Sequence, residues 1–240
     1  MFTGIVQQQG TLVSREDIDG DIRLVVDVPL GMTGRVDVGD SIAVNGVCLT
    51  VAGGGDGRVQ FDVSAETLSR TQFGRMAPGA RLNLEPALSA SDPVGGHFVT
   101  GHVDGLGDIT RLEPDGRSHR LEIAAPESLA RYIAFKGCIT VDGVSLTVNE
   151  VNDARFGVNV VPHTWSVTNM RDYAVGARVH LEVDLIARYL ERLIGGAQEP
   201  AAEPDITTDF LSRQGFLPPL DDAEPEEDGE RRDSRSERPE

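Results

Sequence analysis

The sequence contains two copies of one segment, and this repeat constrains the fold more than any other feature. Shifting the chain by 97 positions lays residues 41–51 (SIAVNGVCLTV) over residues 138–148 (CITVDGVSLTV). The same shift aligns Thr-Gly pairs at residues 3–4 and 100–101. A repeat of this length indicates one structural unit used twice. The 240 residues are therefore expected to form two similar domains of about 95 residues each.

Within each copy, short segments alternate between apolar and polar residues. Residues 24–28, 59–63 and 82–84 all show this pattern. Alternation with a period of two is typical of half-buried β-strands. The pattern predicts an all-β fold of two small barrels in tandem. One short helix per copy is also expected, most clearly at residues 126–133, where a proline stands in the first turn.

The chain after the second copy has a different character. Residues 185–194 carry an apolar stripe at helical spacing and are followed by two glycines, which predicts an amphipathic C-terminal helix. This helix either packs on its own barrel or joins subunits, and both interpretations stay open. The predicted divisions are an N-terminal domain (1–97, including a linker from residue 87), a C-terminal domain (98–184), the helix (185–196) and an acidic tail (197–240).

The acidic tail holds about half of the net charge of −17. From residue 199 onward there are 14 acidic residues against 5 arginines, with many prolines among them. Such a segment cannot bury enough apolar surface to offset its ordering entropy, so a disordered tail is predicted. Only the stretch from Phe210 to Leu217 is apolar enough to act as a short docking element, and a solvated tail without a specific role is the simpler interpretation.

Composition and missing motifs exclude several classes of function. The net charge argues against nucleic acid as a partner, because phosphate binding needs clustered basic residues. No apolar run is long enough for a transmembrane helix, and the N-terminus does not resemble an export signal, so a cytoplasmic protein is expected. The two cysteines and five histidines show no zinc spacing, and no metal is expected. Signatures of hydrolases, nucleotide-hydrolysing P-loop proteins and Rossmann dehydrogenases are missing.

The duplicated segment also predicts where chemistry takes place. Asn45-Gly46 and Asp142-Gly143 are strong signals for tight hairpin turns. The strand after each turn places its aliphatic residues on one face, and Cys48 and Thr50, or Ser145 and Thr147, on the other. Small polar residues on one face of a strand are usually a plain solvent face. Their recurrence in both copies favours a pair of related sites.

Several motifs together resemble the riboflavin synthase alpha-chain family, and the similarity runs from Met1 to about residue 193. The motifs are the first six residues MFTGIV, the run NGVCLT at 45–50, VGGH at 94–97 followed by GHV at 101–103, and Lys136-Gly followed by DGVSLT at 142–147. Lys136 is the only lysine in the chain. The resemblance implies two six-stranded Greek-key β-barrels, a homotrimer assembled through C-terminal helices, and no cofactor. Association with a lumazine synthase shell is left open.

The resemblance also implies a reaction and a set of site residues. The family is a transferase of riboflavin biosynthesis that dismutates two molecules of 6,7-dimethyl-8-ribityllumazine into riboflavin and 5-amino-6-ribitylaminouracil by transfer of a four-carbon unit. Its active site forms where the N-terminal barrel of one subunit meets the C-terminal barrel of a neighbour. The implied catalytic residues are Phe2, Cys48, His102, Ser145 and Thr147. The implied substrate-binding residues are Gly4, Ile5, Val6, Cys48, Leu49, Thr50, Asp62, Val63, Ser64, Ala65, Glu66, Thr67, Gly101, His102, Val103, Lys136, Ser145, Leu146, Thr147, Asn159, Val160, Val161, Pro162, His163 and Thr164.

From these residues we expect different roles for the two barrels. Cys48 is expected to line the N-terminal side and assist addition to the ring, whereas His102, Ser145 and Thr147 act on the C-terminal side. Each repeat is expected to supply one complete pocket, so residues 1–97 alone would bind one ligand. The alternative function is a non-catalytic lumazine- or flavin-binding protein of the same superfamily. A flavin domain of a reductase fits poorly, since no nicotinamide-binding domain follows.

Overall fold

The computed structural model describes residues 1–29, 32 and 36–195. The acidic tail (197–240), its apolar stretch from Phe210 to Leu217, and the last residue of the expected helix lie outside the described residues. No helix among the described residues has the length and apolar character needed to cross a membrane.

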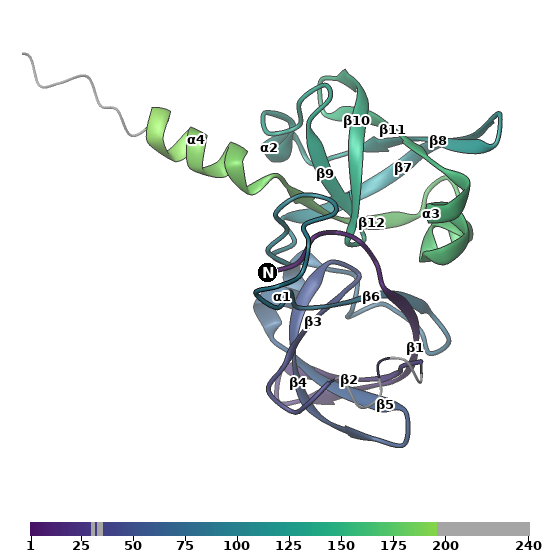
Figure 1. Cartoon of the computed structure of the whole chain (residues 1–240), viewed down its shortest axis with the longest axis vertical. Coiled ribbons are helices and arrows are strands. Elements are labelled where there is room, and N and C mark those ends of the chain that lie inside the picture. The colour runs from purple at the N-terminus through teal and green to yellow at the C-terminus, as the bar shows by residue number, and fades with distance from the viewer. Residues whose placement is uncertain (30–31, 33–35, 196–240) are drawn as a thin grey trace, which may run out of the picture. The chain divides into compact units, whose positions relative to one another are not determined.

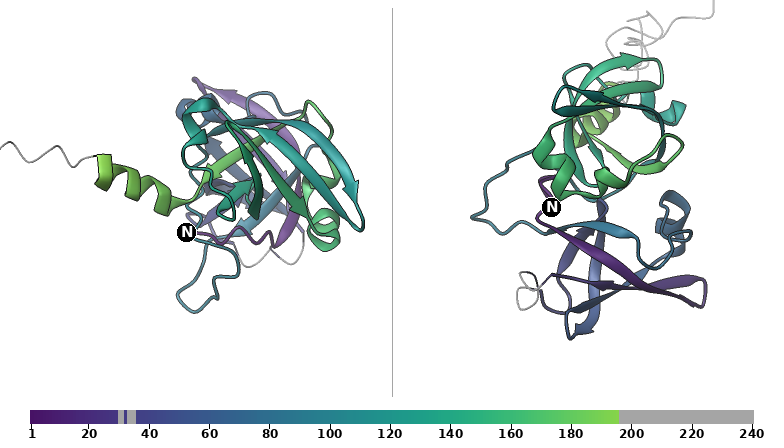
Figure 2. Two further views of the ribbon diagram at one scale, coloured as in Figure 1. Left: turned by 90° about the horizontal axis from the view of Figure 1, so that it is seen from above. Right: turned by 90° about the vertical axis from the view of Figure 1, so that its right-hand side faces the viewer.

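The described chain forms two closed six-stranded barrels, which confirms the all-β fold expected from the repeat (Figures 1 and 2). The first barrel consists of β1 (Gln8–Ile18), β2 (Asp21–Asp27), β3 (Ser41–Val44), β4 (Val47–Gly55), β5 (Arg58–Val63) and β6 (Arg81–Pro86). The second consists of β7 (Gly105–Asp115), β8 (Ser118–Ala124), β9 (Cys138–Val141), β10 (Val144–Asn152), β11 (Arg155–Val160) and β12 (Arg178–Val183).

The strand order is the same in both barrels. In the first, the strands pair antiparallel in the order β1-β2-β5-β4-β3-β6, and the equivalent strands of the second follow the same cyclic order. Strands β3, β4 and β5 follow one another through hairpins. The strand before them in the chain, β2, pairs with β5, and this is the Greek-key arrangement. Irregularities in pairing between Leu12 and Ser14 and between Val51 and Gly53 recur 97 positions later. The repeat therefore extends to the bulges.

The helices match the sequence only in part. Helix α2 (Glu127–Ala130) lies in the predicted segment but has a single turn, and helix α4 (Leu185–Gly195) forms as expected after β12. The equivalent helices α1 (Ala65–Arg70) and α3 (Pro162–Val167) follow β5 and β11; α1 is a short helix of the first copy, as expected, but the sequence did not locate it, and α3 is additional to the one helix expected in the second copy. Their six residues show no apolar stripe and no fully buried side chain, so periodicity could not identify them. A 3-10 turn (Asn169–Asp172) follows α3.

The aliphatic face of each barrel strand fills the barrel interior, as the alternation predicts. Val47, Leu49 and Val51 of β4 are almost completely buried in the first core, whereas Cys48 is half-buried and Thr50 exposed. Strand β10 repeats the pattern, with the difference that Leu146 is only partly buried against the second core. Cys48 and Ser145 therefore lie outside the barrel interiors.

The two barrels meet around their matching hairpin turns. Asn45 and Asp142 have positive φ angles, and a Cβ atom added to Gly46 would lie 2.7 Å from the backbone nitrogen of Gly143. Glycine is required there because the two backbones touch. Next to the turns, buried side chains are hydrogen-bonded across the junction: Asn83 Nδ2 donates to the Oδ1 of Asn169 at 2.9 Å. Such buried hydrogen bonds between the repeats favour one arrangement of the two barrels, because separating them would leave buried polar groups without partners.

Candidate active site

Each repeat begins with a short segment that reaches the other barrel. Phe2 and Val99, which are equivalent in the repeat, form an antiparallel bridge with each other. Beyond this bridge, the Gly4 carbonyl accepts a hydrogen bond from Ser145 N on β10, and the Gly101 carbonyl accepts one from Cys48 N on β4, both at 2.8 Å. The first repeat therefore contributes Gly4 to the site of the second barrel, and the second contributes Gly101 to the site of the first.

Close approach at these contacts requires glycine. Gly4 and Gly101 have φ angles of +74° and +80°. A Cβ atom on Gly101 would lie 2.6 Å from the Cβ of Cys48, and one on Gly4 would lie 2.7 Å from the Cβ of Ser145. Both the backbone conformation and the available space therefore exclude a side chain.

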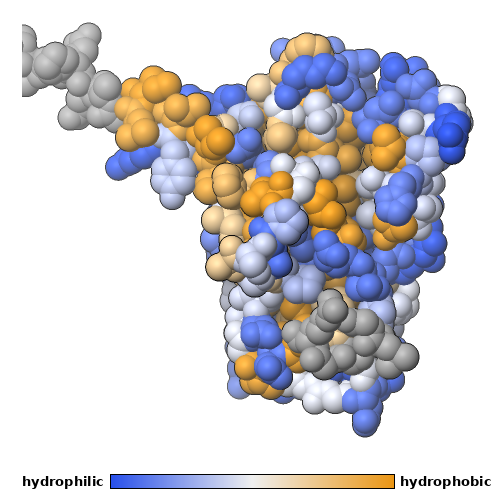
Figure 3. Space-filling model, viewed as in Figure 1, coloured by the Kyte–Doolittle hydropathy of each residue, from blue (hydrophilic) through white to orange (hydrophobic). Residues whose placement is uncertain are grey.

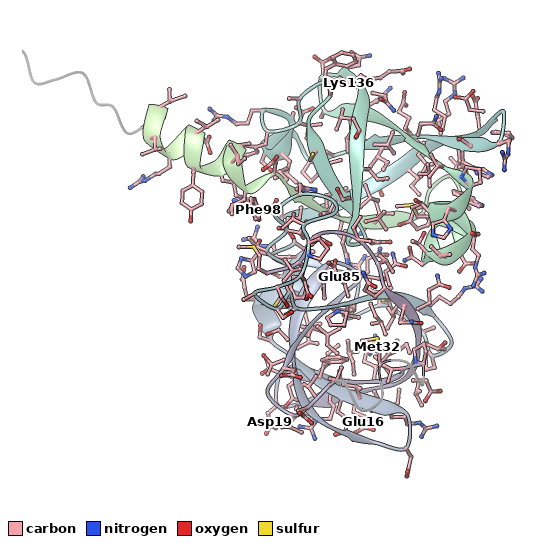
Figure 4. All side chains as sticks on the ribbon, in the orientation of Figure 1. Glu16, Asp19, Met32, Glu85, Phe98 and Lys136 are labelled. Carbon is pink, nitrogen blue, oxygen red and sulfur yellow. The ribbon has the colours of Figure 1, made fainter. Side chains whose placement is uncertain are left out.

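A buried glutamate holds each crossing segment in place. Glu85 accepts hydrogen bonds from Thr3 N, Thr3 Oγ1 and Gly4 N, and Glu182 accepts the equivalent three from Thr100 and Gly101, at 2.7–3.0 Å. Figure 4 shows Glu85 beside the N-terminal segment. Burial raises the pKa of Glu85, while the hydrogen bonds from the Thr3–Gly4 segment oppose that rise by stabilising the carboxylate. The two glutamates position the segments rather than face a ligand.

The Cys48 side of the junction opens into a cavity of about 630 Å³. Its volume lies in the usual range for small-molecule sites. From the first repeat it is lined by Val47, Cys48 and the helix α1 residues Glu66, Thr67 and Arg70, together with Thr71. From the second half it is lined by Thr100, Gly101, His102, Val103, Asp104, Ser128, Leu129, Tyr132, Leu185 and Arg188. The cavity is therefore shared by both repeats and by α4.

The Ser145 side has a different chemical character. The Nδ1 atom of His97 lies 2.8 Å from Ser145 Oγ, and His97 N donates to the Thr3 carbonyl at 3.2 Å. Burial lowers the pKa of His97, and the nearby carboxylates of Asp184 and Glu182 partly oppose this. The imidazole is therefore neutral near pH 7 and can either donate a proton to Ser145 or accept one from it. Such a pair is suited to acid–base chemistry.

These positions change two expectations from the sequence. His102 lines the Cys48 cavity and is not brought to Ser145, because its segment crosses to the first barrel. The N-terminal repeat does not supply a complete pocket, since residues 100–104, 128–132 and α4 form the rest of the wall. Both differences follow from the exchange of the initial segments between barrels.

The structure brings together only part of the predicted binding set. Leu49, Val63 and Val160 are buried in the barrel cores, and Phe2 is fully buried where it supports the junction. Nine further residues of the set are exposed and do not line the Cys48 cavity: Ile5, Thr50, Asp62, Ser64, Ala65, Thr147, Asn159, Val161 and His163. Val6, Leu146, Pro162 and Thr164 are partly buried and lie outside that cavity.

Lys136 lies apart from both Cys48 and Ser145. Its Nζ donates to Asn149 Oδ1 at 2.9 Å, and it lines a smaller cavity of about 300 Å³ that also contains Asn159. Figure 4 shows it at the outer end of the second barrel. Among the described residues, no group of three or more His, Cys, Asp or Glu side chains could hold a metal ion.

Two parts of the site could not be found from sequence patterns. His97 lies in the linker at a position without a counterpart in the first copy, so the repeat does not mark it. The only sequence feature that marks His97 is the VGGH motif at residues 94–97, in which it follows two glycines. The wall formed by Asp104, Tyr132 and Arg188 joins residues from three separate segments, and only the folded chain brings them together.

Comparisons with known proteins agree with this architecture. The lumazine binding domain family matches twice, at residues 3–87 and 100–184. Riboflavin synthase of Mycobacterium tuberculosis is 45% identical over 201 residues, which cover 82% of this chain and all of that protein. Riboflavin synthase of Bacillus subtilis is 38% identical over 216 residues, covering 90% of this chain and all of that one.

Solved structures show the same fold. The crystal structure of LumP complexed with riboflavin superposes with a TM-score of 0.72 at 27% identity, covering 76% of this chain and 99% of LumP. LumP complexed with 6,7-dimethyl-8-(1'-D-ribityl) lumazine has a TM-score of 0.70 at 26% identity, with the same coverage. The tandem barrels, the duplicated site and the identity along the whole length of the relatives show that this chain belongs to the riboflavin synthase family.

Proposed function

We propose that this chain is a transferase that converts two molecules of 6,7-dimethyl-8-ribityllumazine into riboflavin and 5-amino-6-ribitylaminouracil. A four-carbon unit passes from one lumazine to the other. The proposal is supported by identities of 38–45% to riboflavin synthases over their full lengths. The proposed reaction uses the site residues expected from the sequence, with two changes. His102 lies beside Cys48, and His97 joins Ser145.

The observation that carries the proposal is a duplicated site whose two copies differ in chemistry. A reaction between two identical molecules needs two similar binding sites, and the crossing Gly4 and Gly101 segments provide equivalent frames. The lumazine that donates the four-carbon unit and the lumazine that accepts it need different catalytic groups. Cys48 on one side occupies the position that Ser145, next to His97, occupies on the other. Positioning both substrates can contribute ~7–11 kcal/mol to lowering the barrier.

We assign the acid–base role to the Ser145–His97 pair. The C7 methyl group of the lumazine is acidic because its anion is delocalised over the fused ring. A neutral imidazole next to a hydroxyl is suited to accept that proton and return it later. Cys48 and His102 line the other side, where we expect them to assist addition at the second ring, with Cys48→Ser lowering the rate.

The proposal includes a homotrimer assembled through α4. Ile186, Tyr189, Leu190, Leu193 and Ile194 on this helix are each more than half exposed. Figure 3 shows hydrophobic residues gathered on this helix. An apolar stripe without a partner among the described residues favours subunit contact over packing on its own barrel. In the trimer, the Cys48 side of one subunit would face the Ser145 side of a neighbour.

Further parts of the proposal follow from the family and the sequence. We take the domains as 1–97 and 98–184, the place of action as the cytoplasm, and the reaction as independent of a cofactor. Co-purification with lumazine synthase tests whether a shell of that protein is a partner.

The direct test is to mix the purified chain with dimethylribityllumazine and follow the absorbance of riboflavin. We expect one riboflavin for every two lumazines consumed. Tight binding of the lumazine without riboflavin formation would refute the enzyme and support a non-catalytic binding protein instead. The LumP structures show that the same fold binds these ligands, but the identity to LumP is only 26–27%.

A further inference from the structure

Helix α4, which follows the second barrel in the chain, forms part of the wall of the Cys48 cavity. Leu185 and Arg188 of α4 line this cavity together with Ser128, Leu129 and Tyr132 at and after α2. The exposed apolar stripe of α4 uses other positions. The helix therefore has one set of residues for the cavity and another that is free for subunit contact.

Arg188 is held by a buried carboxylate. Its Nη2 group is paired with Asp104 Oδ1, and the Asp104 side chain is only 5% exposed, against 44% for Arg188. The other oxygen, Asp104 Oδ2, accepts a hydrogen bond from Val183 N at 2.8 Å, which fixes the carboxylate to the end of β12. The guanidinium also lies 5.9 Å from the centre of the Tyr132 ring. These contacts orient the Arg188 side chain at the cavity wall.

The pair with Asp104 leaves donors of Arg188 unused. A guanidinium carries five N–H groups in a rigid plane, and only Asp104 accepts a hydrogen bond or ion pair from Arg188 among the contacts of the described residues. The cavity that Arg188 lines also has Thr67 and Ser128, which carry hydroxyl groups, in its wall. This lining suits a ligand segment rich in oxygen acceptors.

The distance along the chain indicates which part of the ligand reaches Arg188. Gly101 touches Cys48, and Asp104 follows three residues later, at most about 10 Å away, where its N–H donates to Leu181 of β12. With the reacting ring beside Cys48 and His102, the part of the substrate outside the ring is left to contact Arg188, which lines the same cavity. The ribityl chain, with its four hydroxyl groups, is the acceptor-rich part of the substrate.

We infer that Arg188, oriented by Asp104, is a substrate-binding residue of the Cys48 cavity that recognises the ribityl chain. This inference rests on the proposed function, which supplies the ligand and the place of the ring. The helix proposed to join the subunits would then also complete a substrate pocket, so that the pocket depends on the presence of α4.

The test compares ligands with and without a ribityl chain. Riboflavin and lumiflavin share the ring, but lumiflavin carries a methyl group in place of the ribityl chain. Each is titrated into the full-length protein and into Arg188→Gln by fluorescence. We expect R188Q to weaken riboflavin binding at one of the two sites by about tenfold or more, the usual loss for a hydrogen bond from a charged group. Binding of lumiflavin is expected to stay unchanged.

Two further variants separate the guanidinium from the helix. Arg192→Gln removes an exposed arginine one turn further along α4. Glu191→Gln weakens the attachment of α4, because Glu191 bonds Arg131 and the cavity residue Tyr132, but Glu191 itself does not line the cavity. Both should bind riboflavin like the parent chain, and Arg188→Lys should recover part of the R188Q loss. Light scattering and circular dichroism establish that all variants keep the same mass and fold.

The outcomes are distinct. Unchanged riboflavin binding in R188Q would overturn the inference, as would an equal loss in E191Q, which would mean that docking of the helix matters and the guanidinium does not. An equal loss for riboflavin and lumiflavin would overturn the assignment to the ribityl chain. If the parent chain binds neither flavin nor lumazine and forms no riboflavin, the proposed function itself fails.

Discussion

Replacing Gly101 by alanine tests whether the crossing segment builds the Cys48 site. The φ angle of Gly101 is +80°, and a left-handed conformation costs an L-residue about 1–2 kcal/mol. The new Cβ would also lie 2.8 Å from Cys48 N and 2.6 Å from its Cβ. The segment must therefore move, and the hydrogen bond between Cys48 N and the Gly101 carbonyl is lost at a cost of about 1 kcal/mol.

Displacement of the segment also weakens its bonds to Glu182. Hydrogen bonds to a charged group contribute about 1.5–3 kcal/mol each, and Gly101 N donates one of them at 3.0 Å. We therefore expect G101A to lower the free energy of unfolding by about 4 kcal/mol. Because a shift of about 1 Å in a positioned group can cost two orders of magnitude in rate, kcat/KM should fall about 100-fold.

Gly176→Ala is the matched control. Its φ angle is +88°, but a Cβ atom there has no neighbour within 4 Å, so only the backbone strain of about 1–2 kcal/mol applies. Urea denaturation followed by circular dichroism measures stability, and riboflavin formation measures activity. Equal stability and equal activity of the two variants would refute the reasoning, because the close approach to Cys48 would then have no energetic consequence.

The remaining predictions concern the Ser145 side, the repeat and α4. Because burial lowers the pKa of His97, the acid limb of the pH profile of kcat/KM should lie below pH 6.5. His97→Gln should remove this limb and lower the rate about 100-fold. An acid limb that persists in H97Q would belong to another group and contradict the assignment. A fragment of residues 1–97 should bind riboflavin only as a dimer, because a second copy of the fragment must supply Gly4 in place of Gly101. Calorimetry should therefore show weaker binding on dilution. Binding by a monomer at an affinity independent of protein concentration would contradict the shared cavity. Ending the chain at residue 184 should leave folded barrels with fewer subunits per particle in light scattering, whereas ending it at residue 199 should change neither the number of subunits nor the activity. An unchanged number of subunits after the first truncation would place α4 on its own barrel.

Local physical rules were enough to predict that each repeat forms a small β-barrel, whereas the six-stranded Greek-key arrangement was implied only by the resemblance to the family. The apolar-polar alternation of residues 59–63 places Val59, Phe61 and Val63 inside the barrel, because side chains of a strand point alternately to its two faces. The Asn-Gly and Asp-Gly dipeptides predict the hairpins, because both residues of the turn need positive φ angles. The same shift of 97 positions relates the residues flanking the bulges of both barrels.

The candidate site was predictable only as a set of residue types. Alternation placed Cys48 and Ser145 outside the barrel interiors, and the repeat identified them as counterparts. The sequence could not show that His102 belongs with Cys48, since this depends on the Phe2–Val99 bridge, which sends each initial segment to the opposite barrel. The positions of helices α1 and α3 were not predicted because six residues on a surface carry no periodic signal.

What the sequence alone determined is the part governed by neighbours along the chain: two equal barrels, their turns, their aliphatic interiors and an amphipathic C-terminal helix. Only the tertiary structure decided that Gly4 reaches Ser145, that His97 bonds the same serine, and that Arg188 meets Asp104 beside the Cys48 cavity. Each of these contacts joins residues that are 48 or more positions apart. They depend on how the folded barrels and helix α4 fit together, and no local preference of the chain encodes that fit.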